Sequence, residues 1–62
     1  METRALYFKR RAGEERTAAA RAGNLKARGR HLELADAYDF RGREFAALDS
    51  QVEAELMSRS AE

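Results

Sequence analysis

Residues 25 to about 58 constrain the fold most, because this stretch contains no proline and its apolar residues recur at helical spacing. Leu34 and Leu48 flank the main apolar row, and only Asp49 interrupts it. The pattern predicts one long amphipathic helix of about 50 Å, or two helices broken at Gly42. With a period near 3.5 residues, the row consists of His31, Ala35, Tyr38, Gly42, Phe45, Val52 and Leu56.

The length and composition predict association with other chains. A chain of 62 residues forms at most one domain and buries only about 60% of its unfolded surface, so we expect a single domain over residues 1–62. Domains of this size usually gain stability from disulfides, metal sites or partners. The absence of cysteine excludes disulfides, and a single histidine makes a zinc site unfavourable. We therefore expect no cofactor, and stabilisation by a partner chain.

The same composition predicts an all-α fold. Charged residues make up 37% of the chain and hydrophobic residues 44%, many of them alanine, as in long helices and coiled coils. Proline is absent, and the β-branched residues are only Thr3, Thr17 and Val52, so strands are disfavoured. No apolar run is long enough to cross a bilayer, and we expect a cytoplasmic protein.

Two helices joined by a short turn are expected. Thr3 is a suitable N-cap for a first helix over about residues 4–22. Gly23 can take the left-handed conformation that closes this helix, and Asn24 can cap the second helix at about 25–58, so the pair forms a short turn. Folding about this turn places residues whose numbers sum to about 47 side by side. Phe8 would then reach Tyr38, whereas Phe45 and the apolar residues after it would have no partner in the hairpin.

Charge divides the chain into unequal halves. Residues 1–30 contain nine Lys or Arg and three Glu, a net charge of +6, whereas residues 31–62 contain three Arg and eight acids, a net charge of −5. The halves can attract each other within a hairpin, or the basic half can bind an external anion.

Two segments of the sequence resemble short bacterial proteins of unknown function. The first is Tyr7-Phe8-x-Arg10-Arg11-Ala12-x-Glu14-Glu15 with the alanine run to Ala22, and the second is Arg28-x-x-His31-Leu32-Glu33-Leu34-Ala35-x-x-Tyr38. The resemblance covers about residues 6–38, departs from the pattern at Gly29, and implies a helical hairpin with an Arg- and Ala-rich first helix and a "HLELAxxY"-like second helix. It implies no activity.

His31 and the carboxylates invite a catalytic or metal-binding interpretation. In the expected hairpin His31 lies near Glu15 and Arg16, but no nucleophile accompanies it, so we expect an interface histidine, with a pH-sensitive contact or a catalytic or metal-binding role as the alternatives. The acids at positions 14, 15, 33, 36 and 39 lack the Glu-x-x-His pair of carboxylate metal sites, and we expect them to face solvent and pair with arginines.

These observations predict a helical hairpin with a longer second helix that dimerises into a four-helix arrangement. The hypothesis is a non-enzymatic self-association or protein-interaction module, and the apolar stripe also fits a different protein partner. The alternative is a small nucleic-acid-binding regulator; no membrane contact is expected. The expected oligomer or partner interface is Leu32, Leu34, Tyr38, Phe45, Leu48, Val52 and Leu56. The candidate anion or nucleic-acid contacts are Lys9, Arg10, Arg11, Arg16, Lys26, Arg28 and Arg30.

Overall fold

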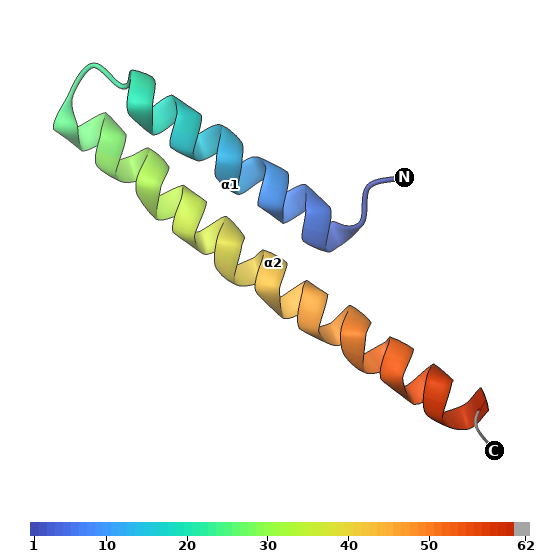
Figure 1. Ribbon diagram of the computed structural model, residues 1–62. Helices are drawn as coiled ribbons and strands as arrows, with labels where there is room; N and C mark the ends of the chain where they lie inside the picture. The colour runs from blue at the N-terminus through green and yellow to red at the C-terminus, as the bar shows by residue number, and fades with distance from the viewer. Residues whose placement is uncertain (61–62) are drawn as a thin grey trace.

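The chain is an antiparallel pair of helices of unequal length (Figure 1). The computed structural model describes residues 1–60, so the last two residues of the expected domain lie outside the described part. Helix α1 spans Arg4–Arg21 and helix α2 spans Leu25–Ser60. Residues 1–60 contain no strand, which confirms the all-α class and the hairpin with a longer second helix. None of the helices described is long and apolar enough to span a membrane.

Side-chain caps fix where both helices begin. The Thr3 hydroxyl accepts a hydrogen bond from the Leu6 N–H at 3.1 Å, which satisfies one free donor in the first turn of α1. The Asn24 side-chain oxygen accepts from the Ala27 N–H at 2.8 Å and performs the same role for α2. Both predicted caps therefore act at the predicted positions.

The end of α1 differs from the prediction. We expected Gly23 to close the helix in the left-handed conformation, but no residue of the described chain has a positive φ. Instead Ala22 is extended, with φ −64° and ψ 137°, and its N–H donates to the Ala19 carbonyl at 3.2 Å. Alanine reaches this extended conformation without strain, so the turn does not require the special freedom of glycine.

Small residues line the contact between the helices. Ala12, Ala19 and Ala35 form the buried apolar core. The helices lie close together at Gly42, where a Cβ atom would lie 3.3 Å from the Phe8 Cβ and 3.6 Å from the Ala5 carbonyl oxygen. Alanine and glycine permit this approach but bury little area, so the hairpin contains a thin core.

The position of Gly42 sets a register that differs from the predicted one. With Phe8 against Gly42, residues whose numbers sum to about 50, not 47, lie opposite each other. The shift of about one turn brings Phe45 next to the beginning of α1, so the expectation that Phe45 lacks a partner in the hairpin is wrong.

Helix α2 continues past Gly42 without interruption and extends beyond α1 (Figure 1). We call residues 47–60 the overhang; at about 1.5 Å per residue it measures roughly 20 Å. Residues 46–59 are all exposed. The Cα atoms of the hairpin extend over 58 × 19 × 10 Å, so the molecule is a thin rod that is two helices wide at one end and one helix wide at the other.

Candidate functional site

Three aromatic rings, one from α1 and two from α2, pack together between the helices. Phe8 of α1 stacks on Phe45 with a centroid distance of 5.6 Å and an interplanar angle of 3°, and it lies 5.9 Å from the Tyr38 ring. Tyr7 meets Phe8 edge to face at 5.2 Å. Tyr38 and Phe45 belong to the predicted interface, but both are half-buried against Phe8 within the hairpin. They stabilise the fold before any partner binds.

Two arginines of α1 cover the rings of Tyr38 and Phe45, a feature that we did not predict. The Arg4 guanidinium lies 4.4 Å from the centroid of Phe45, and the Arg11 guanidinium lies 5.3 Å from the centroid of Tyr38. Arg4 and Arg11 are seven residues apart in α1, and Tyr38 and Phe45 are seven residues apart in α2. The same arginine–ring contact is therefore made twice along the hairpin. Cation–π contacts of this kind contribute about 0.5–1 kcal/mol each at exposed sites.

The other five predicted interface residues are exposed. Leu32 and Leu34 lie on the part of α2 that α1 accompanies, whereas Leu48, Val52 and Leu56 lie on the overhang. Leu48 is 50% exposed, Val52 54% and Leu56 57%. Val52 and Leu56 continue the row that includes Phe45. The face of α2 that packs on α1 therefore remains apolar in the overhang, where α1 no longer covers it.

Arg10 and Arg11, both predicted anion contacts, are held in ion pairs on α1. Arg10 binds Glu2 at 2.9 Å and Glu14 at 2.8 Å, and Arg11 binds Glu14 at 3.3 Å. The hydrogen bond from Arg10 holds the pKa of Glu2 below its ordinary value. These pairs are exposed and contribute at most modestly to stability, but they engage all three guanidinium nitrogens of Arg10 and one of Arg11, which an anion would otherwise contact.

Arg16 is also occupied, in this case across the hairpin. Its guanidinium donates to the Asp39 carboxylate, and this hydrogen bond lowers the pKa of Asp39. The contact joins the basic half of the chain to the acidic half. Attraction between the two halves within the hairpin is one of the two outcomes that the division of charge predicts. Lys9 is exposed and lines a shallow hollow with Leu6, Asp39 and Ala46.

The remaining predicted basic contacts gather near the turn without acidic partners. Lys26, Arg28 and Arg30 are exposed, as is Arg21 at the end of α1. Within residues 1–60 none of these four forms an ion pair. The sequence between Arg16 and Glu33 contains no Asp or Glu, so we name residues 21–32 the basic end of the rod.

His31 meets Glu15, as predicted from their positions in the hairpin. The His31 Nδ1 atom lies 3.3 Å from the Glu15 Oε1 atom, and Glu15 is only 8% exposed. The contact supplies a polar partner to a carboxylate in an otherwise apolar seam, which lowers the cost of its burial. The serines at positions 50, 58 and 60 lie on the overhang, so none accompanies His31 as a nucleophile.

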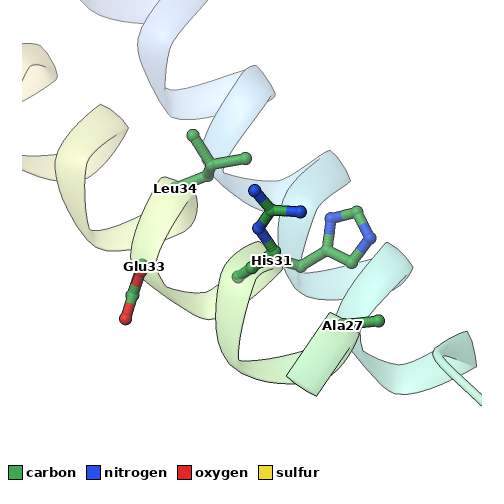
Figure 2. A pocket seen from close by; sticks show the side chains of 5 residues that line it. Ala27, His31, Glu33 and Leu34 are labelled. Atoms are coloured by element: carbon green, nitrogen blue, oxygen red, sulfur yellow. The ribbon is translucent and has the colours of Figure 1, made fainter. Parts of the chain in front are cut away.

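An open hollow lies beside His31 on the basic end, lined by Ala27, Arg30, His31, Glu33 and Leu34 (Figure 2). The Glu33 side chain points away from His31. No group of three or more potential metal ligands occurs in the described part of the chain. The lining combines the apolar side chains of Ala27 and Leu34 with the ionisable side chains of Arg30, His31 and Glu33.

Comparison with protein-family models, with curated proteins and with solved structures finds no match to this chain.

Proposed function

We propose that the chain is a small non-enzymatic helical module that associates with a second copy of itself, as a dimer with four helices. The overhang carries this proposal, because its apolar row continues from the hairpin seam while Leu48 and Val52 remain half exposed. The first part of this row packs on α1. Because the overhang continues the row with the same helical spacing, it can pack on another helix in the same way.

The thin core supports the same proposal. Within the described part of the chain the buried apolar residues are all alanines, and two helices with such a core are a poor candidate for independent stability. A second hairpin would add buried leucine and valine area at about 25 cal/mol per Å². Association therefore supplies the stabilisation that the chain lacks.

Two matched substitutions test the proposal by sedimentation velocity. Leu48→Glu should convert the associated protein to the 7.0 kDa chain, because it places a charge on the half-exposed apolar side of the overhang, beside the row. Ser50→Glu is the control, because Ser50 is exposed on the same overhang but lies about 160° around the helix from Leu48. If both variants keep the parent's mass and helicity, the overhang is not the interface and the proposal fails.

Nucleic-acid binding is the second candidate, favoured by the four unpaired basic residues at the basic end. Phosphate contacts there would release counterions, so binding would weaken steeply with added salt. Fluorescence anisotropy of labelled duplex DNA and of single-stranded RNA at low ionic strength tests this candidate. Binding that the double variant Lys26→Glu/Arg28→Glu abolishes would support it, and no change in anisotropy at low salt would exclude it.

A further inference from the structure

One strip of α2 combines exposed apolar residues with unpaired charges. The strip runs from Ala27 to Glu55 at alternating spacings of three and four residues, beside the row that packs on α1. Its apolar members include Leu34 and Leu48, which are 44% and 50% exposed. We call it the flank strip.

The charges of the flank strip have no partner within the hairpin. Arg30, Arg41, Glu44 and Glu55 are exposed, and none forms an ion pair within residues 1–60. The opposite flank differs, because its Asp39 is already bound by Arg16. The flank strip therefore offers both apolar area and free charge along its length.

These charges are arranged symmetrically along the helix. Arg41 and Glu44 are equally distant from the point between residues 42 and 43, and so are Arg30 and Glu55. A strip with this arrangement is complementary to itself when a second copy is turned end over end, which is what a two-fold interface requires. Each Arg would then face a Glu of the other copy, and each contact would occur twice.

The apolar residues fit the same register. Leu34 of one copy falls opposite Gln51 of the other, in the gap between Leu48 and Val52. The hollow beside Leu34 on the basic end, lined in part by Ala27 and Arg30 (Figure 2), comes to lie against the overhang of the other copy. The acidic, apolar overhang and the basic, hollowed end thus cover each other.

We infer that two hairpins dock antiparallel along their flank strips, with the two-fold axis between residues 42 and 43 and with Arg41 facing Glu44 and Arg30 facing Glu55 across the interface. The occupant is a second copy of this chain, because a symmetric charge pattern of this kind is what self-pairing needs. The inference rests on the proposed self-association and adds its surface, direction and register.

Disulfide cross-linking tests the register directly, since the chain has no cysteine of its own. Ala37 and Leu48 are also symmetric about the axis, so a mixture of the Ala37→Cys and Leu48→Cys proteins should form a covalent heterodimer on mild oxidation. Either protein alone should not, because its two cysteines would be about 16 Å apart along the axis, beyond the roughly 7 Å between Cα atoms that a disulfide allows. Ala37→Cys mixed with Ala20→Cys on α1 is the control.

Charge reversal tests the pairing independently of cysteine. Arg41→Glu should raise the dissociation constant about tenfold or more, because it places like charges opposite each other at two symmetric positions. The double variant Arg41→Glu/Glu44→Arg should restore it. Arg43→Glu, with the same change in charge two residues away and off the flank strip, should leave the constant within about twofold.

The outcomes separate this inference from the proposed function. A parent protein of twice 7.0 kDa that gives no Ala37–Leu48 cross-link, or that is weakened equally by Arg41→Glu and Arg43→Glu, associates through another surface and overturns only the inference. A parent protein that stays at 7.0 kDa at every concentration overturns both.

Discussion

Replacing the helical glycines by alanine should reveal where the helices touch. Gly13, Gly29 and Gly42 all lie within helices, where alanine is favoured over glycine by about 1 kcal/mol. A Cβ at Gly13 or Gly29 would meet nothing within 4 Å. Each of these substitutions should raise the free energy of unfolding by about 1 kcal/mol and the melting temperature by about 4–8 °C.

Gly42→Ala should behave in the opposite way. The new Cβ would lie 3.3 Å from the Phe8 Cβ, which is fixed to its backbone and cannot rotate aside, so α1 would have to move. Overpacking of this kind costs about 1–3 kcal/mol, which exceeds the helix-propensity gain. We expect a net loss of about 1 kcal/mol.

Thermal and urea unfolding monitored by circular dichroism, at one fixed protein concentration, measure the three variants. Gly13→Ala and Gly29→Ala serve as controls for helix propensity in each helix. A Gly42→Ala protein stabilised as much as these two would refute the close contact between α1 and α2 and the register derived from it.

Three further predictions concern the stability of the hairpin. Phe8→Ala removes the ring that joins the aromatic contact and should lower the free energy of unfolding by about 2–3 kcal/mol in urea unfolding, less than for a fully buried phenylalanine; helicity equal to the parent's throughout the titration would contradict this. Asn24→Ala removes the acceptor for the Ala27 N–H and should cost about 1 kcal/mol, whereas Asn24→Asp should cost little; equal melting temperatures for both would show that the cap is not used. Acid should weaken the hairpin, because Arg16 lowers the pKa of Asp39: this contribution is complete above about pH 4 and is lost as the pH falls through the lowered value. Asp39→Asn should flatten that part of the stability profile, and an unchanged profile would contradict the pairing.

The periodic row of α2 made most of the fold predictable. His31, Ala35, Tyr38, Gly42 and Phe45 occupy the face predicted for them, and each is buried or half-buried. Apolar spacing determines this face because each residue turns the helix by about 100°, whatever the partner is. The same argument predicts the exposed continuation of the row into the overhang.

The register was not predictable from the turn alone. Counting from Gly23 and Asn24 gave a sum of about 47, but the stagger of two helices depends on which side chains fit between them, and the fit of Phe8 against Gly42 favours a shift of about one turn. The placement of Phe45 was wrong for the same reason.

The arginine contacts on the rings were missed because the charge of Arg11 suggested an anion contact and no contact was predicted for Arg4. Arg4 and Arg11 recur seven residues apart in α1, and Tyr38 and Phe45 recur seven apart in α2. Such matched spacing is the signal in the sequence that could have indicated stacking across the hairpin.

Light scattering behind a sizing column, across a wide range of protein concentration, tests the central claim most directly. The account predicts a mass of twice 7.0 kDa at high concentration that falls toward 7.0 kDa on dilution, together with loss of helicity as the thin core loses its second copy. A stable, fully helical chain of 7.0 kDa at every concentration would contradict it.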